Sequence, residues 1–396
     1  MPDVGFVNLF AVAAIALAAP LLLGLAPRLR IPAVVLEIVA GIALGPSGLG
    51  WIEPDLPVQV VALLGLAFLL FLAGLEIDVH RLRGRALRVA LLGYVLTLVL
   101  GLAAGAGFAA AGWVHSPLLV AVALSATSLG LVVPVLKDAG QAEGGLGQAV
   151  IAAASVADFA AVLLVSLLFS ASGGSTGARL VLLAAFAGLV VVTALVVAAA
   201  GRSRRLGTTL TRLQDTTAEI RVRAAVVLLV AFVALAEAFG LESILGAFLA
   251  GAVVGLLDRD SASHPRFRVK LDAIGYGFLV PVFFVTSGLR LDLSGLLADA
   301  GALARVPLFL VALLLARGIP ALLFTREFGA RRAVAAGLLQ ATSLPFLVTA
   351  TQIGVLTGLM TPVTAAALVC AGLLSVLLFP AGALVLLRSR DRAAVR

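Results

Sequence analysis

The feature that most constrains the fold is a series of apolar segments, each long enough to cross a lipid bilayer. A spanning helix needs about 20 predominantly apolar residues, and such windows follow one another along the whole sequence with short polar connections. Hydrophobic residues make up 62% of the chain and charged residues only 12%, and the mean hydropathy is +1.19. These values predict a multi-pass membrane protein in which residues 1–396 form a single integral domain.

We predict about thirteen spanning helices, and therefore an all-α membrane protein. The predicted spans are 7–26, 31–46, 57–75, 86–112, 117–137, 144–170, 178–200, 219–239, 242–257, 270–289, 302–324, 332–357 and 361–387. The first span is expected to be retained as a helix, because no basic residue precedes Arg28 and a signal peptide begins with a positively charged region.

The basic residues indicate the orientation. Nearly all of the 28 Lys and Arg residues fall in connections on one side of the predicted helices, and such connections are cytoplasmic in membrane proteins. We therefore expect the N-terminus outside and the C-terminus inside. This topology also explains the net charge of +8, so we expect the lipid bilayer and not nucleic acid as a partner. The Ala-, Gly- and Arg-rich composition suggests a bacterial cytoplasmic (inner) membrane.

A short word occurs twice, each time in a polar interruption of a predicted span. The segment SATSL at 125–129 recurs as QATSL at 340–344, with Pro134 and Pro345 close by. The copies lie seven predicted helices apart, so they cross the membrane in opposite directions. Inverted repeats with broken helices are typical of secondary transporters. We predict two inverted repeats, about 7–170 and 219–387, with one broken helix in each and a connecting helix and loop at 171–218.

Asp158 is the first candidate for a functional residue. It is the only charged residue in the apolar run 147–169, and an aspartate at mid-helix costs roughly 2.5 to 3.5 kcal/mol in a bilayer. Ser155 lies one helical turn earlier on the same face, and Thr127 and Ser128 belong to the preceding broken helix. Oxygen ligands of this kind suit an s-block cation.

We therefore expect Asp158, Ser155, Thr127 and Ser128 to form the ion- and proton-binding site, with Na⁺ or K⁺ held by Asp158 and Ser155. The alternative for Asp158 is a structural bond to a neighbouring helix. Serine and threonine residues on membrane helices are also common in packing, which is the alternative for Ser155 and Thr127.

Two further charges lie inside predicted spans. Arg317 is the only basic residue deep in an apolar span, and Glu37 lies at the centre of 31–46. Buried charges in a membrane need partners, and Arg does not release its proton at neutral pH. We expect an Arg317–Glu37 pair that supports the structure, together with Thr342 and Ser343 of the second broken helix. The alternative is that Arg317 faces Asp158 and competes with the substrate ion.

The histidines argue against an enzyme. His80, His115 and His264 all fall in predicted connections, so no histidine at membrane depth could act as a general base or metal ligand. An intramembrane serine protease or metalloprotease needs one, and an aspartyl enzyme needs a second mid-membrane aspartate. Cys370 is the only cysteine, which excludes an intrachain disulfide. We expect no enzymatic activity and no cofactor besides the transported ions.

Five motifs in this order resemble the cation:proton antiporters of the sodium/proton exchanger superfamily, in particular the second monovalent cation:proton antiporter family. They are EIVAGIALGPS at 37–47, FLAGLEID at 71–78, ALSATS at 123–128 with VLKD at 135–138, AE at 236–237 with LGAFLAG at 245–251, and PVFFVTSGL at 281–289. The resemblance covers nearly the whole chain. It implies a mobile ion-carrying core, a scaffold that forms a homodimer, and Asp158 as the shared cation and proton site. Ala157 precedes Asp158, where family members often have Asp, Asn or Gln.

The expected function is secondary antiport of Na⁺ or K⁺ against H⁺ by alternating access. A carboxylate in a low-dielectric cavity holds a proton until a cation replaces it, and either occupant neutralises the site. With one titrating carboxylate we expect electroneutral exchange. The alternative to this stoichiometry is that Glu37 supplies a second proton if it is not committed to Arg317. The alternative is a sodium-coupled symporter of an organic anion on a similar inverted-repeat fold. No ring-like filter sequence that would indicate a channel is present.

Overall fold

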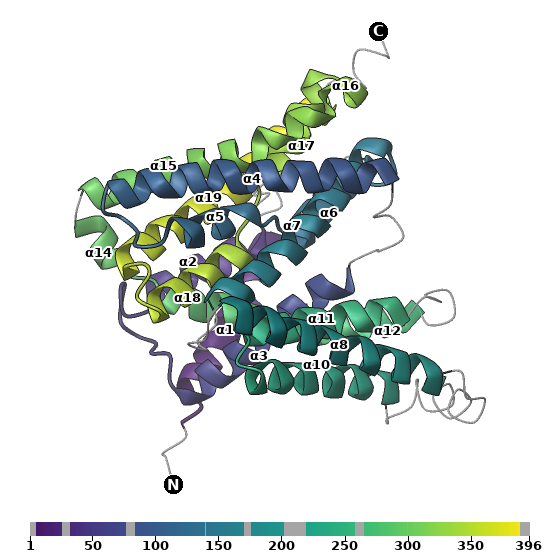
Figure 1. The fold of residues 1–396 in the computed structure, drawn as a ribbon. Helices are drawn as coiled ribbons and strands as arrows, with labels where there is room; N and C mark the ends of the chain where they lie inside the picture. Colours follow the sequence, from purple (N-terminus) through teal and green to yellow (C-terminus); the bar gives the residue numbers. More distant parts are fainter. Residues whose placement is uncertain are drawn as a thin grey trace. The chain divides into compact units, whose positions relative to one another are not determined.

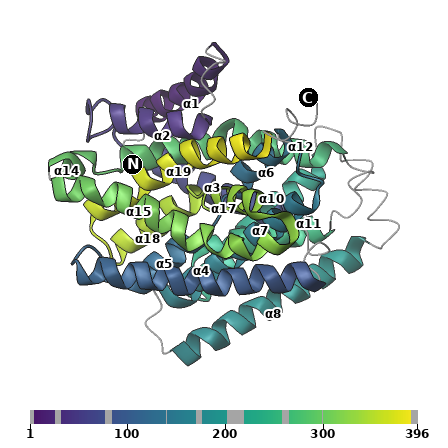
Figure 2. The ribbon, with the colours of Figure 1, turned by 90° about the horizontal axis from the view of Figure 1, so that it is seen from above.

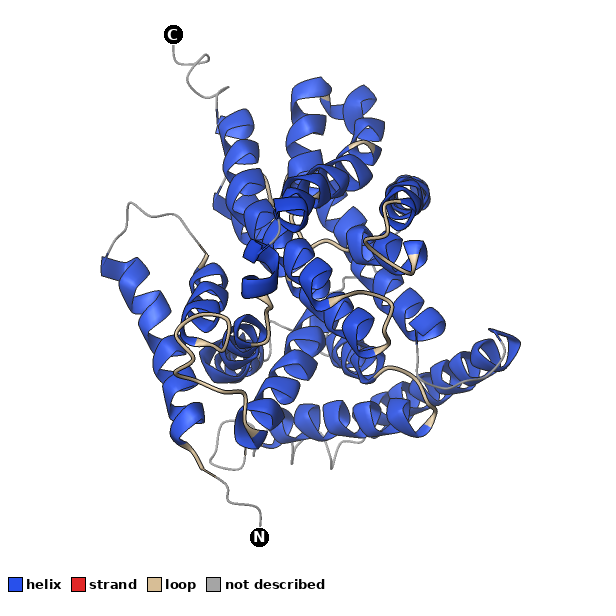
Figure 3. Ribbon diagram, turned by 90° about the vertical axis from the view of Figure 1, so that its left-hand side faces the viewer, coloured by secondary structure: helices blue, strands red, loops and turns tan. Residues whose placement is uncertain are grey.

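The computed structural model describes residues 5–25, 32–76, 84–138, 140–169, 176–201, 219–257, 265–298 and 300–388. Figure 3 shows that the regular structure in these residues is helical, as predicted. The one exception within them is an isolated antiparallel bridge between Val114 and Met360. Every predicted span overlaps at least one described helix.

The described helices (Figure 1) follow in chain order. They are α1 (Val7–Leu25), α2 (Ala33–Leu44), α3 (Leu56–Leu75), α4 (Gly84–Ala110), α5 (Pro117–Ser125), α6 (Leu129–Asp138), α7 (Gly145–Phe169), α8 (Thr176–Gly201), α10 (Ile220–Ala238), α11 (Ser243–Leu257), α12 (Pro265–Ile274), the π-helix η1 (Gly275–Leu279), α13 (Val280–Leu289), α14 (Leu293–Ala298), α15 (Ala300–Gly318), the 3₁₀ helix η2 (Pro320–Phe324), α16 (Thr325–Phe328), α17 (Ala330–Gln340), α18 (Pro345–Leu356) and α19 (Pro362–Arg388).

The length and composition of these helices identify a multi-pass membrane protein. Within the described ranges, seven helices are long and apolar enough to cross a membrane, and the bent pair α17 and α18 raises this to eight. Four further apolar helices are shorter, at Ala33–Leu44, Pro117–Val133, Leu180–Thr193 and Ser243–Leu257. The count of thirteen spans therefore stays a prediction.

The chain divides into two compact units. Unit 1 comprises Met1–Ala16, Pro54–Asp78 and Val162–Thr286, and unit 2 comprises Leu17–Glu53, Val79–Ala161 and Ser287–Arg396. Each unit combines segments from both halves of the sequence, so the units are not the two predicted repeats. Three of the five boundaries, at 16/17, 161/162 and 286/287, fall inside α1, α7 and α13.

Unit 1 is built around a close approach of α3 and α11. A Cβ atom added at Gly251 of α11 would lie 2.7 Å from the carbonyl carbon of Phe71, and one at Gly74 of α3 would lie 3.0 Å from that of Phe248. Such distances leave no room for a side chain, so the glycines allow the two backbones to touch. Near one end of this pair, the guanidinium of Arg268 donates to the carbonyl of Leu75 (2.8 Å).

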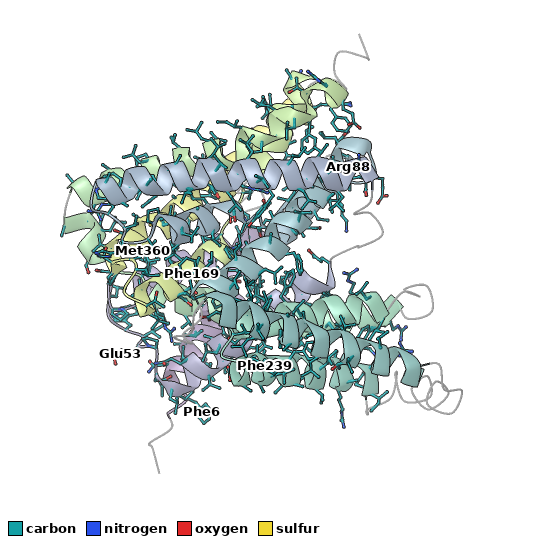
Figure 4. The ribbon with its side chains drawn as sticks, in the orientation of Figure 1. Phe6, Glu53, Arg88, Phe169, Phe239 and Met360 are labelled. Carbon is teal, nitrogen blue, oxygen red and sulfur yellow. The ribbon has the colours of Figure 1, made fainter. Side chains whose placement is uncertain are left out.

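Unit 2 contains most of the polar residues that the sequence singles out. Figures 1 and 2 both draw α5 alongside α4, and α15 packs on α19. The loop before α5 and the loop before α19 are joined at Val114 and Met360, the latter labelled in Figure 4. Beside them the Arg305 guanidinium lies 5.3 Å from the ring centre of Trp113. These contacts close the end of unit 2 at which α5 begins and α18 ends.

Candidate functional site

The first copy of the repeated word interrupts a helix, as predicted. Helix α5 ends at Ser125 and α6 begins at Leu129, and the residues between them are not helical. The hydroxyl of Ser125 donates to the carbonyl of Val122 (2.8 Å), which is the local competition for backbone groups that serine offers. Ala126 then adopts an extended backbone, with φ −78° and ψ 156°.

The second copy also interrupts a helix. Helix α17 ends at Gln340 and α18 begins at Pro345, with a bend of 45° between them. Proline has no N–H to donate, and it disfavours helical geometry in the residue before it. Leu344 has φ −143° and ψ −56°, which lies outside helical geometry. Both predicted broken helices are therefore present, whereas the inverted relation of the two repeats stays a prediction.

The two interruptions meet inside unit 2. The backbone N–H of Ser128 donates to the carbonyl of Thr342 (3.0 Å), and the hydroxyl of Thr127 donates to the carbonyl of Gln340 (2.8 Å). Backbone groups at membrane depth have no water to bond and must find partners within the protein. Each interruption supplies partners for the other.

Asp158 of α7 lies at this meeting point. Its Oδ1 atom accepts a hydrogen bond from the backbone N–H of Thr127 (2.9 Å). Ser155, one turn earlier on α7, is only 3% exposed and Ser128 only 9%. Within the described residues, the carbonyl oxygens of Ala126 and Thr127 accept no hydrogen bond. The structure thus places a carboxylate next to uncommitted backbone oxygens, which are hard ligands for a small cation.

Arg317 of α15 holds the two interruptions together. Its side chain is 2% exposed and donates from Nε to the carbonyl of Gln340 (3.2 Å), from Nη1 to the Thr97 hydroxyl (3.4 Å) and from Nη2 to the Thr127 hydroxyl. The Thr127 hydroxyl therefore accepts from Arg317 and donates to Gln340. We expected this hydroxyl among the ion ligands, but the structure engages it in the arginine network.

The predicted pair between Arg317 and Glu37 is wrong. Glu37 is 5% exposed in α2, and no hydrogen bond or ion pair joins it to Arg317 within the described residues. The planar guanidinium instead donates its hydrogen bonds to neutral oxygens of the two interruptions and of α4. Asp158 lies close enough to Arg317 to interact with it electrostatically, as in the alternative that Arg317 faces Asp158, whereas competition between Arg317 and the substrate ion stays a prediction.

Four polar contributors were not named as site residues from the sequence, although Gln340 belongs to the repeated word. Tyr94 and Thr97 of α4 are buried, and the Tyr94 hydroxyl lies 3.1 Å from the Ser125 hydroxyl. Gln340 contributes its backbone carbonyl, and Ser375 of α19 bonds the second interruption. The available signal was weak, because single hydroxyl residues in apolar helices are usually packing residues.

These features define a class of protein. An all-helical, multi-pass chain in which two interrupted helices meet beside a carboxylate has the architecture of a secondary transporter. The chain belongs to the sodium/hydrogen exchanger family, because the transmembrane model of that family matches residues 13–387. This is a family of transporters and not of enzymes.

Individual relatives agree with this assignment. The chain is 34% identical over 342 residues to the putative Na⁺/H⁺ antiporter YjbQ of Bacillus subtilis, covering 83% of this chain and 54% of that protein. It is 31% identical over 296 residues to the Na⁺/H⁺-K⁺ antiporter GerN of Bacillus cereus, covering 72% of each. The chain thus spans about half the length of YjbQ.

A solved structure shows the same fold. The sodium proton antiporter MjNhaP1 of Methanocaldococcus jannaschii at pH 8 superposes with a TM-score of 0.64 at 18% identity, covering 96% of this chain and 98% of that one.

The Arg317 network predicts the effect of removing the guanidinium. Arg317→Ala removes the guanidinium bonds to the Gln340 carbonyl and the Thr127 hydroxyl, which within the described residues keep only their bond to each other, and a hydrogen bond to a charged group contributes about 1.5–3 kcal/mol. We expect a lower melting temperature in detergent. Glu37→Gln should not restore it, and the double variant should show additive losses, because the two residues do not touch. Recovery of stability in the double variant would contradict this prediction and support an Arg317–Glu37 pair.

Proposed function

We propose that this protein is a secondary antiporter that exchanges Na⁺ or K⁺ for H⁺, with Asp158 as the shared site. The observation that carries the proposal is the hydrogen bond from the Thr127 N–H to Asp158 at the place where the two interrupted helices meet. Relatives named as Na⁺/H⁺ and Na⁺/H⁺-K⁺ antiporters support it.

The proposed chemistry is competition for one carboxylate. Asp158 binds a proton in one half of the cycle and a cation in the other, and the cation is also coordinated by the Ser155 hydroxyl and by the carbonyl oxygens of Ala126 and Thr127. A single negative charge is neutralised by either monovalent occupant, which lowers the cost of moving the site through the membrane. Both ions cannot occupy the carboxylate together, so transport of one requires release of the other.

Arg317 plays a fixed part in this scheme. Its positive charge is held by the Thr127 hydroxyl and the Gln340 carbonyl, and an arginine does not give up its proton at neutral pH. Its charge therefore stays the same throughout the cycle, and it carries no ion itself. Glu37, which is not paired with Arg317, is the group that would supply a second proton if net charge moved in each cycle.

We further propose alternating access in a homodimer in the bacterial cytoplasmic membrane, with the N-terminus outside and the C-terminus inside. The distribution of Lys and Arg among the connections supports this orientation. Exchange is proposed to be electroneutral, because Ala157 precedes Asp158 and one titrating carboxylate allows one proton for one monovalent cation.

The direct test is exchange by purified protein in proteoliposomes that contain a pH-sensitive dye. Addition of Na⁺, K⁺ or Li⁺ separately should change the internal pH with the wild-type protein, and Asp158→Asn should abolish the change while keeping a normal elution profile. Asp55→Asn is the matched control, because Asp55 also accepts a backbone N–H, from Val58 (3.2 Å). Asparagine caps a helix as well as aspartate does, so this control should exchange normally.

Two results would contradict the proposal. Exchange by Asp158→Asn at the wild-type rate would remove the central residue from the mechanism. No pH change on addition of any of the three cations to wild-type proteoliposomes would instead favour the sodium-coupled symporter.

The stoichiometry can be tested in the same vesicles. An electroneutral exchanger should give the same initial rate of Na⁺-driven pH change with and without a potassium–valinomycin clamp on the membrane voltage. Strong acceleration by the clamp would show that net charge moves in each cycle and that a second proton is carried.

A further inference from the structure

Ser375 of α19 forms hydrogen bonds with both backbone groups of Ser343, the N–H and the carbonyl, in the second interruption. Its side chain is fully buried, with 0% exposure. Its Oγ atom accepts from the N–H of Ser343 (3.3 Å), and its proton can be donated to the carbonyl of Gly372 (2.7 Å) or of Ser343 (3.1 Å). Interruption of the helix leaves these groups of Ser343 without their helical partners, and Ser375 supplies replacements.

This arrangement parallels the bond made by Asp158. The N–H of Thr127 in the first interruption donates to Asp158, 31 residues later in the chain. The N–H of Ser343 in the second interruption donates to Ser375, 32 residues later. In each case a side chain of the next long helix in the sequence caps a backbone N–H that the interruption has freed. The two caps differ in charge, since a carboxylate gains and loses charge with its occupants and a hydroxyl does not.

The second interruption in turn positions the groups around Asp158. The carbonyl of Thr342 accepts from the N–H of Ser128 (3.0 Å). The carbonyl of Gln340 accepts from the Thr127 hydroxyl (2.8 Å) and from Arg317 (3.2 Å). A shift at Ser343 would move both carbonyls, because all three residues belong to the same short non-helical stretch and its junction with α17.

Close packing leaves Ser375 little freedom to be replaced by another group. A Cβ atom added at Gly372, one turn earlier on α19, would lie 3.1 Å from the carbonyl oxygen of Ser343. The backbone of α19 therefore runs directly against the interruption. Within the described residues, the side chain that bonds the backbone of Ser343 is that of Ser375.

We propose that Ser375 is the uncharged counterpart of Asp158 and a positioning residue for cation binding. Its hydrogen bonds hold the second interruption in one conformation. The cation ligands on the first interruption therefore keep their geometry while the charge on Asp158 changes. A cation needs several oxygens at set distances, so its affinity depends on this conformation. The inference rests on the proposed antiport, since it concerns affinity for the transported cation.

The test compares Ser375→Ala with a matched serine outside the site. Ser166 of α7 is likewise 0% exposed, and its Oγ also accepts a backbone N–H at 3.3 Å, from Glu242 in unit 1. The measurement is the initial rate of Na⁺-driven pH change in proteoliposomes as a function of Na⁺ concentration, which separates KM from the maximal rate. Melting temperatures of the same preparations in detergent report folding.

Ser375→Ala should raise the KM for Na⁺ about tenfold, which corresponds to about 1.4 kcal/mol. Ser166→Ala should leave the KM unchanged, although both variants lose one buried hydroxyl and should melt at lower temperature. Ser375→Cys separates loss of hydrogen bonding from loss of side-chain volume, because a thiol is larger than a hydroxyl but is a weak donor and acceptor. It should behave like Ser375→Ala.

Two outcomes would overturn the inference. One is a lower maximal rate in Ser375→Ala with the wild-type KM, as expected if Ser375 only stabilises the fold. The other is a wild-type KM in Ser375→Cys, which would assign the effect to packing. Absence of exchange by the wild-type protein would count against the proposed function instead, and the melting temperatures identify a variant that fails to fold.

Discussion

The hydrogen bonds between the two interrupted helices are the constraint on which the rest of unit 2 depends. An interruption at membrane depth frees backbone N–H and carbonyl groups, which must be bonded within the protein or line a cavity. Here the bonds run from Ser128 to Thr342 and from Thr127 to Gln340, while Asp158 and Ser375 cap the remaining N–H groups of Thr127 and Ser343. The proposed ion site is thus a consequence of how the interruptions are satisfied.

This arrangement explains why a carboxylate and a guanidinium can both be tolerated in an apolar protein. Arg317 is surrounded by the oxygens of Gln340, Thr127 and Thr97, and Asp158 supplies the negative charge in its electrostatic environment. Burial of a charge is costly unless it is paired and hydrogen-bonded. The same oxygen-rich environment that stabilises the guanidinium leaves the carbonyls of Ala126 and Thr127 available for a cation.

The sequence predicted the parts of the site that depend on depth and on local backbone chemistry. The repeated word at 125–129 and 340–344 located both interruptions, and the apolar run around Asp158 located the carboxylate. The Arg317–Glu37 pair was wrong because hydropathy gives the depth of a residue but not the direction it faces or the helix beside it. Ser375 and Thr97 were missed because a hydroxyl that caps an interruption cannot be told from one that packs.

The central claim is that one cation displaces one proton from Asp158. The most direct measurement is isothermal titration calorimetry of Na⁺ into the purified protein, repeated in buffers with different ionisation enthalpies, because the dependence of the heat on the buffer counts the protons released. The account predicts a release that approaches one proton per Na⁺ bound as the pH is lowered, and no binding signal in Asp158→Asn. Na⁺ binding without proton release at any pH, or with the same release in Asp158→Asn, would contradict it.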